Sequence, residues 1–443
     1  MVGFTSDFGE GQSTYQIFQN YSQFASSTKD PIRAKMGAVA SALTEQLQSA
    51  DPSTSSPSSS AYFAITITTL LSPTAESYRL ELLKLLIISL PETSTSLLQK
   101  HEKDIHKILT SAYKVAMLDD GNSNSNSNSN SNSNSNSNSN SNSNSNAMLR
   151  TIISVASTYF TTLPTTKNTF SRPSTLKLFH VILTSFDDRR PKVRKHAHSS
   201  ASSVLLHHSP NYQLADHVGE FVQTVLKSTT ATDTTKALHL LSFLQQVSLT
   251  QFSLRLPRRL PHHSYKTNII LGQSLTSFSP QSISKIGELL LHLISLQNVI
   301  LTASALSTLL VLVQDSSSTL TSIPPPFLTA LLASLLKNSK TYAPKTDVES
   351  YVTYTRLIVA TTSHLLSKST QETTAMVKKL LPTVVSVVCQ TCDHGDDETV
   401  GACASELRKL LITTLGSGSG GGGLGEECVK SCVQSMECLL SFR

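Results

Sequence analysis

The cysteines near residue 400 have a spacing that could bind zinc. Cys389 and Cys392 are separated by two residues, and His394 and Cys403 follow. Thiolate and imidazole groups at such spacings are the usual ligands of tetrahedral zinc sites. However, a second Cys-x-x-Cys pair is absent, and Cys389 and Cys392 continue the apolar run VVSVV. Cysteines in such a run behave as small hydrophobic residues, so we expect core packing and no metal site.

The remaining cysteines and the paired histidines also lack partners for chemistry. Cys428, Cys432 and Cys438 lie at helical spacings, which favours packing or contact with a partner over catalysis. The pairs His207-His208 and His262-His263 have no carboxylate or cysteine cluster beside them in the sequence. We therefore expect both pairs on the surface.

Two motif-like stretches that could indicate catalysis have simpler structural explanations. Gly416, Gly418 and Gly421 match G-x-G-x-x-G, but they follow a helical pattern rather than a strand, and no lysine-bearing phosphate loop occurs. The acids at 396–398 directly precede a helical pattern, whose positive N-terminal end attracts them. We therefore expect no catalytic residue, no cofactor and no small-molecule substrate.

Basic residues offer a different chemistry, which is contact with phosphate groups. The stretch DDRRPKVRKHAH (187–198) is the most highly charged short segment of the chain. A second basic stretch, RLPRRLPHHSYK (255–266), is held extended by its prolines and could be an import signal or an RNA contact. The candidate RNA-binding residues of the two stretches are Arg189, Arg190, Lys192, Arg194, Lys195, Arg255, Arg258, Arg259 and Lys266.

The first basic stretch also has a purely structural interpretation. The residue before a proline is disfavoured in helical geometry, so Arg190 is the expected N-cap and Pro191 the first helical residue. In this interpretation Arg194 supports the turn through an adjacent Asp, and the other cations are solvated. If all five cations contacted phosphates, RNA affinity would fall with salt at a log–log slope of about −3.5 to −4.5.

Helical patterns run through most of the chain. A break at Lys29-Asp30-Pro31 separates two helices within 13–50, and AYFAITITTLL (61–71) is predicted to be helical despite its strand-like Ile and Thr content. The further predicted helices cover 75–90, 94–118, 148–163, 174–186, 191–206, 236–249, 281–296, 299–313, 325–337, 347–367, 374–391 and 400–411.

A repeated spacing connects several of these helices. In the helix predicted at 191–206, Val193, Ala197, Ala201 and Val204 fall within about 80° of one another at 100° per residue. The exposed side then holds Lys192, Lys195 and His196, with Arg194 at the edge. Helix, short turn and helix recur at 289–312 and 380–411, where Val299 with Ala303 and Val400 with Ala404 repeat the Val-x-x-x-Ala spacing. This pattern is typical of HEAT/armadillo-type α-solenoids, and a non-repeating helical bundle is the alternative.

The bulk composition fits a helical protein outside the membrane. Lys and Arg number 36 against 30 acids, and the resulting net charge of +6 permits an acidic partner such as RNA without requiring one. The longest apolar runs are shorter than the roughly 18 residues that span a bilayer, and no secretory signal is recognisable. Six cysteines in such a chain favour a reducing compartment, so we expect the nucleus or cytoplasm and no membrane contact.

The Asn/Ser alternation from Asn122 to Asn146 has no apolar residue to bury, so we expect it to be a disordered insertion in a loop. The predicted organisation is a flexible N-terminus (1–12), N-terminal helical repeats (13–120), the disordered tract (121–147), a HEAT-type solenoid (148–415), a Gly-rich linker (416–425) and a C-terminal amphipathic helix (426–443).

Several stretches in this order resemble the ribosomal RNA-processing protein twelve family of pre-ribosome maturation factors. They are AYFAITITTLL (61–71), RPKVRKHAHSSASSVL (190–205), TTKALHLLSFLQQV (234–247), LISLQNVILTASALSTLLVLV (293–313) and the acidic turn with its helix at 396–411. The resemblance spans residues 14–415. The Asn/Ser tract and the basic loop at 255–266 depart from the family, as does the Gly-rich end in place of further repeats.

The resemblance implies a non-enzymatic helical-repeat scaffold in pre-rRNA processing and in nuclear export of ribosomal subunits. The implied partners are pre-ribosomal particles and Ran- or karyopherin-type transport proteins, and the implied location is the nucleolus and nucleus. An alternative is a transport-receptor-like adaptor that binds protein cargo or a small GTPase without touching RNA. Crosslinking of RNA to the basic stretches would separate the two.

Overall fold

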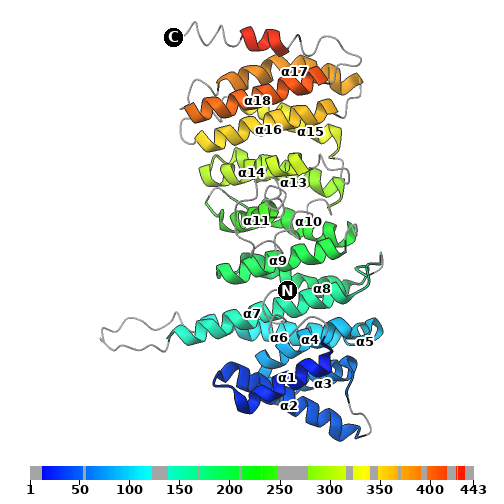
Figure 1. The fold of residues 1–443 in the computed structure, drawn as a ribbon. Coiled ribbons are helices and arrows are strands. Elements are labelled where there is room, and N and C mark those ends of the chain that lie inside the picture. Colours follow the sequence, from blue (N-terminus) through cyan, green and yellow to red (C-terminus); the bar gives the residue numbers. More distant parts are fainter. Residues whose placement is uncertain are drawn as a thin grey trace, which may run out of the picture. The chain divides into compact units, whose positions relative to one another are not determined.

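The computed structural model describes residues 12–52, 56–121, 138–166, 169–208, 212–230, 232–246, 278–315, 323–339, 348–367, 371–390, 397–416, 426 and 428–434. All regular elements of these residues are helices, which confirms the predicted all-α class (Figure 1). By their internal contacts the residues form two compact units, Met1–Leu214 and Ala215–Arg443. None of the described helices is long and apolar enough to cross a bilayer.

The last α-helix of the first unit contains most of the basic stretch 187–198. The α-helices of this unit are α1 (Thr14–Ser27), α2 (Pro31–Ala50), α3 (Ser59–Leu71), α4 (Arg79–Ser89), α5 (Thr95–Lys100), α6 (Glu102–Gly121), α7 (Asn138–Thr162), α8 (Pro173–Thr184) and α9 (Pro191–His207). Short 3-10 helices, η1 (Pro73–Tyr78), η2 (Leu90–Glu92) and η4 (Ser185–Asp187), join some of them.

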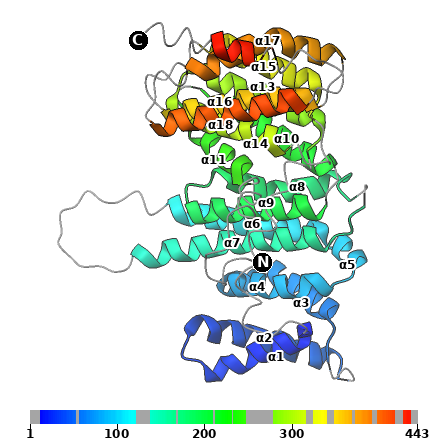
Figure 2. The same cartoon turned by 45° about the horizontal axis from the view of Figure 1, so that its top comes forward.

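The first unit is built from helix pairs in two rows. Helices α3, α6 and α8 pack in succession, and so do α4, α7 and α9, while α3 packs on α4, α6 on α7 and α8 on α9. The α6–α7 pair is visible in Figure 2, where both helices run side by side. The helices on either side of residues 122–137 are therefore direct neighbours.

The second unit has the same plan. Its helices are α11 (Thr235–Gln246), α13 (Pro280–Ser295), α14 (Val299–Asp315), α15 (Pro325–Asn338), α16 (Val348–Ser367), α17 (Gln371–Gln390) and α18 (Asp397–Gly416). Helices α13, α15 and α17 pack in one succession, and α11, α14, α16 and α18 in another. Helix α10 (Tyr212–Lys227) spans the boundary between the units.

Local sequence explains where several helices begin. Asp30 accepts a hydrogen bond from the Ile32 amide (3.0 Å) and Pro31 is the first residue of α2, as the break predicted there requires. Ser13 and Gln16 form a reciprocal capping box at the start of α1. Ser279 caps α13 ahead of Pro280.

Three buried threonines pair their hydroxyl groups with the backbone of their own helix. Thr66, Thr361 and Thr362 are fully buried, and each hydroxyl donates to the carbonyl four residues earlier, at 2.7 to 2.8 Å. A buried polar group that lacked such a bond would cost free energy. This back-bonding lets residues 61–71 form a helix although their composition suits a strand.

The buried positions predicted from the repeated Val-x-x-x-Ala spacing are only partly correct. In α9 the stripe Val193, Ala197, Ala201 and Val204 is fully buried, as predicted. In contrast, Val299 is 53% exposed and Val400 is 38% exposed, so the equivalence of their Val-x-x-x-Ala pairs to the α9 stripe is wrong. Helix α14 does contain a buried series with the same spacing as the α9 stripe, but it begins two residues after Val299. Its members are Leu301, Ala305, Leu309 and Leu312, which are 0 to 4% exposed. Packing against α11, α13 and α16 sets which side of α14 is buried, and spacing alone does not reveal it.

Two further elements differ from the prediction. Helix α7 begins at Asn138, so the last part of the segment expected to be disordered has a helical backbone. Extending the apolar part of α7 toward its N-terminus costs less free energy than nucleating a new helix would. Helix α10 was not predicted, although Leu214, Val218, Val222 and Leu226 recur at helical spacing and are fully buried.

Candidate nucleic-acid interface

The basic stretch 187–198 forms the turn into α9. The 3-10 helix η4 ends at Asp187, and Arg190 is the N-cap of α9 with extended backbone angles (φ −86°, ψ 113°). Pro191 is the first residue of the helix, as predicted. No side chain accepts a capping hydrogen bond at this N-terminus. The first backbone N–H groups of the helix are therefore not satisfied by a cap.

Arg190 is held by a buried ion pair. Its Nε and Nη2 donate to the two carboxylate oxygens of Asp188 at 2.7 and 2.6 Å, and its backbone N–H donates to Oδ1 at 2.9 Å. The Asp188 side chain is 1% exposed and that of Arg190 is 13% exposed. Such two-point pairs fix geometry strongly.

The same guanidinium connects three helices. Arg190 Nη1 donates to the Ser145 hydroxyl at 2.7 Å, and this hydroxyl donates to the Ala116 carbonyl at 2.9 Å. Ser145 belongs to the Asn/Ser alternation and is 5% exposed. The end of that alternation therefore has a structural partner in the turn before α9.

Arg194 supports the turn as the structural interpretation predicted, but through a different atom. Its Nη1 donates to the Asp188 backbone carbonyl at 2.6 Å, while the Asp188 carboxylate is engaged by Arg190. Both guanidinium groups thus have partners within the protein. The RNA contacts predicted for Arg190 and Arg194 stay predictions.

The other three cations of the stretch have exposed side chains. Arg189, Lys192 and Lys195 are all exposed, and the two lysines are one helical turn apart on α9. Arg150 of α7 is also exposed and lies near α9, since its charge acts on His196. These side chains could contact phosphates next to the N-terminus of α9.

His196 is not part of the exposed charge. It is partly buried between α7 and α9, with Nε2 2.7 Å from the Ser154 hydroxyl, so the prediction that it points away from the packed side is wrong. Burial, aided by the positive charge of Arg150, lowers the pKa of His196 to about 4. The imidazole is therefore neutral at pH 7.

The histidine pair at 207–208 is divided. His207 is exposed as predicted, but His208 is 2% exposed, and its Nε2 lies 2.8 Å from the Phe160 carbonyl. Its ring meets Phe170 edge-on, and burial lowers its pKa. The predicted surface exposure is therefore wrong for His208. The prediction was based on the lack of charged neighbours, but the partners of His208 are a carbonyl and an aromatic ring that are distant in the sequence.

The cysteines pack in the core where the structure describes them. Cys389 is 2% exposed, which confirms its predicted core position, and Cys428 and Cys432 are also buried. A hydrogen bond between the last two thiols lowers the pKa of Cys432 and, together with burial, raises that of Cys428. Among the described residues no group of three or more His, Cys, Asp or Glu side chains is placed to hold a metal ion.

Other predicted site residues lie outside the described residues. These are Arg255, Arg258, Arg259, Lys266, His262, His263, Cys392, His394 and Cys438. Neither a scan against protein-family models nor a search of curated proteins found a match to this chain.

Proposed function

We propose that this protein is a non-enzymatic helical-repeat scaffold of ribosome biogenesis that binds pre-ribosomal RNA and proteins. Each compact unit, taken by itself, supports the HEAT/armadillo-type part of the proposal, because its helices pair and the pairs stack in two rows. Such pairs bury their apolar stripes only against neighbouring pairs and offer extended surfaces for partners.

One observation carries the RNA-binding part. Arg189, Lys192 and Lys195 are exposed around an N-terminus of α9 that no side chain caps. If these three cations contact phosphates, affinity falls with salt at a log–log slope of about −2.1 to −2.7. This value replaces the steeper slope expected for five, because the side chains of Arg190 and Arg194 are only partly exposed and both contact Asp188.

The assignment to ribosome biogenesis has its support in the ordered resemblance across residues 14–415, which includes the α9 stretch RPKVRKHAHSSASSVL. Pre-ribosomal particles and Ran- or karyopherin-type transport proteins are the proposed partners, and the nucleolus and nucleus are the proposed location.

Purification of the tagged chain from nuclear extract, with and without RNase, tests the assignment. We expect pre-rRNA and assembly factors to co-purify, and part of the protein set to be lost after RNase. Recovery of transport proteins alone, unchanged by RNase, would contradict it.

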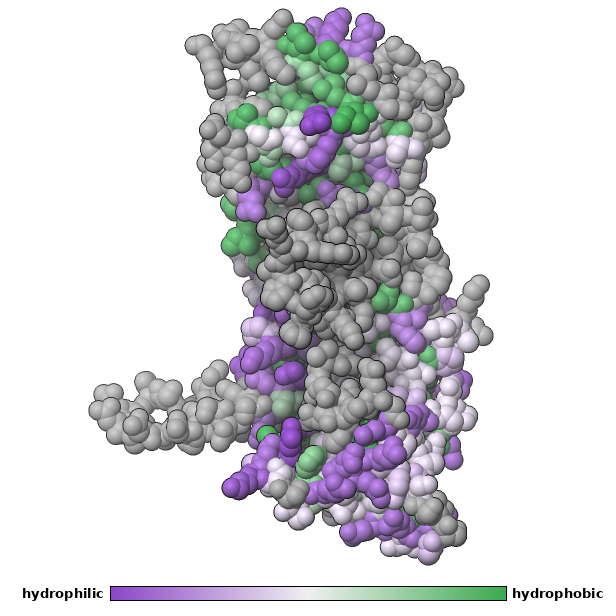
Figure 3. All heavy atoms as spheres, viewed as in Figure 1, coloured by the Kyte–Doolittle hydropathy of each residue, from purple (hydrophilic) through white to green (hydrophobic). Residues whose placement is uncertain are grey.

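That contrary result would favour the transport adaptor as a second candidate function. Exposed apolar side chains in the second unit support a protein partner: Val299, Ile300 and Ile412 are 53%, 66% and 60% exposed. Apolar side chains also reach the surface of this unit in Figure 3. Peptides from 187–198 crosslinked to pre-rRNA would support the RNA-binding scaffold over the adaptor.

A further inference from the structure

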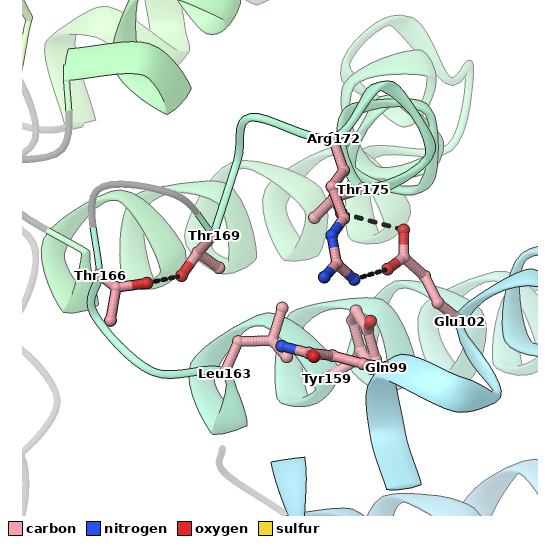
Figure 4. A pocket seen from close by; sticks show the side chains of 8 residues that line it. All are labelled: Gln99, Glu102, Tyr159, Leu163, Thr166, Thr169, Arg172 and Thr175. Carbon is pink, nitrogen blue, oxygen red and sulfur yellow. Dashed lines mark hydrogen bonds and ion pairs between the residues drawn. The ribbon is translucent and has the colours of Figure 1, made fainter. Parts of the chain in front are cut away.

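A pocket in the first unit joins the start of α6 to the end of α7 and the start of α8. Its volume is about 110 Å³, somewhat less than the ~150 Å³ cavity that holds benzene in a well-studied protein. Figure 4 shows the eight side chains that line it: Gln99, Glu102, Tyr159, Leu163, Thr166, Thr169, Arg172 and Thr175.

The carboxylate of Glu102 has fewer partners than a buried anion needs. Glu102 is 5% exposed, and its Oε1 accepts one hydrogen bond, from the Thr175 hydroxyl at 2.9 Å. The other oxygen, Oε2, lies 4.0 Å from Nη1 of Arg172, whose side chain is 56% exposed. A buried carboxylate is stable only when close cations or donors satisfy its oxygens, so Glu102 can take a further donor.

Tyr159 adds a second unsatisfied group on the same pocket. The residue is fully buried, and its hydroxyl has no hydrogen-bond partner among the described residues. In Figure 4 this hydroxyl points toward the space beside Glu102 and Arg172. Burial, and next the charge of Glu102, raise the pKa of Tyr159, so the phenol stays neutral at pH 7.

We propose that this pocket binds a primary ammonium group, from a lysine side chain or from a polyamine, between the Glu102 carboxylate and the Tyr159 hydroxyl oxygen. An ammonium carries three donors and one positive charge. It can therefore satisfy Glu102 Oε2 and the phenol oxygen together, with its alkyl stem beside Leu163, which also lines the pocket.

Arg172 acts in this proposal as a weak internal cation that the ligand displaces. Its guanidinium is half in solvent and 4.0 Å from the carboxylate, too far for a hydrogen bond. An anionic ligand would instead seek Arg172 and be repelled by Glu102. Substitution of Arg172 therefore distinguishes the two, since its loss tightens ammonium binding and weakens anion binding.

Calorimetric titration of the full chain tests the proposal. The probes are N-acetyl-lysine methylamide, spermidine, and N-acetyl-norleucine methylamide, which keeps an apolar stem without the ammonium. We expect saturable binding of at least one amine and none of the norleucine compound. Binding of the lysine probe would identify a protein source, and binding of spermidine alone a polyamine.

Variants define the site. We expect Glu102→Gln to weaken amine binding about 10- to 100-fold and Tyr159→Phe about 2- to 10-fold, as the loss of a charged and of a neutral hydrogen bond predicts. Arg172→Gln should tighten it, and Glu288→Gln, an exposed carboxylate of α13, should change nothing. Tyr159→Phe keeps the test valid if Glu102→Gln does not fold, because it removes only an unpaired hydroxyl.

Three results would overturn the proposal. They are the absence of saturable binding for both amines, equal affinities for the Glu102→Gln and Glu288→Gln variants, and weaker amine binding in the Arg172→Gln variant.

Discussion

At the scale of single residues, the buried pair Asp188–Arg190 is the strongest electrostatic feature of the basic stretch. Replacing Arg190 by Met leaves the Asp188 carboxylate, 1% exposed, without its cation. We expect the free energy of unfolding to fall by about 3–5 kcal/mol, because an uncompensated buried charge remains. Urea denaturation followed by circular dichroism measures this change.

The exposed lysine two residues away provides the control. Lys192→Met should change the free energy of unfolding by less than about 0.5 kcal/mol, as surface substitutions usually do. Equal losses for the two variants would show that Arg190 is not held as described.

His196 makes the stability of the first unit depend on pH. Because burial lowers its pKa from 6.5 to about 4, the unfolded chain binds a proton at a higher pH than the folded one. The contribution of neutral His196 to the free energy of unfolding is therefore fully present above pH 6.5. As the pH falls toward 4, the free energy of unfolding decreases by about 1–3 kcal/mol. His208, whose pKa burial also lowers, acts in the same direction.

Urea denaturation at pH 7 and pH 4.5 measures the effect of His196. The loss of stability on acidification should be smaller in His196→Gln than in the unsubstituted chain. The same loss in both would mean that another group is responsible.

At the scale of the elements, α1 and α2 approach each other at Gly37. A Cβ atom there would lie 2.5 Å from the Tyr21 carbonyl oxygen and 2.6 Å from the Ala25 amide nitrogen, which are backbone atoms that cannot turn aside. We expect Gly37→Ala to lower the free energy of unfolding by about 1–3 kcal/mol. Thermal or urea denaturation reports it.

Gly401 in α18 is a matched control, since a Cβ there meets nothing within 4 Å. Gly401→Ala should stabilise the protein by about 0.5–1 kcal/mol through helix propensity alone. A stabilising Gly37→Ala would refute the close approach of α1 and α2.

Helix starts could be predicted from the sequence because their signals are local. Pro31 after Asp30 and Pro191 after Arg190 are first helical residues by their own chemistry, whatever packs on them. The buried side of α14 could not be predicted in the same way. Its mainly apolar sequence allows several stripes, and the neighbouring helices select the one that begins at Leu301.

The candidate interface also combines features that the sequence predicts with features that only the fold reveals. The turn and its exposed lysines follow from the sequence, but the partner of Arg190 does not. Ser145 lies 45 positions earlier in a polar alternation that has no pattern of burial, and only packing of α7 beside α9 brings it to the guanidinium. Distant contacts of this kind are set by the fold.

At the scale of the whole molecule, two-row packing within each unit is the feature that a scaffold needs. Paired helices leave many side chains exposed along their outer faces, and the first unit exposes Arg189, Lys192 and Lys195 beside one helix start. The proposal therefore depends on whether RNA uses these three cations.

The most direct test is the salt dependence of RNA binding, measured by fluorescence anisotropy. The triple variant Arg189→Gln/Lys192→Gln/Lys195→Gln is compared with Lys285→Gln/Lys337→Gln/Arg408→Gln, which removes three exposed cations of the second unit. We predict that the first variant weakens binding and makes the log–log slope shallower by about 2, while the second keeps the original slope. Equal slopes for both variants, or no RNA binding by the unsubstituted chain, would contradict the account.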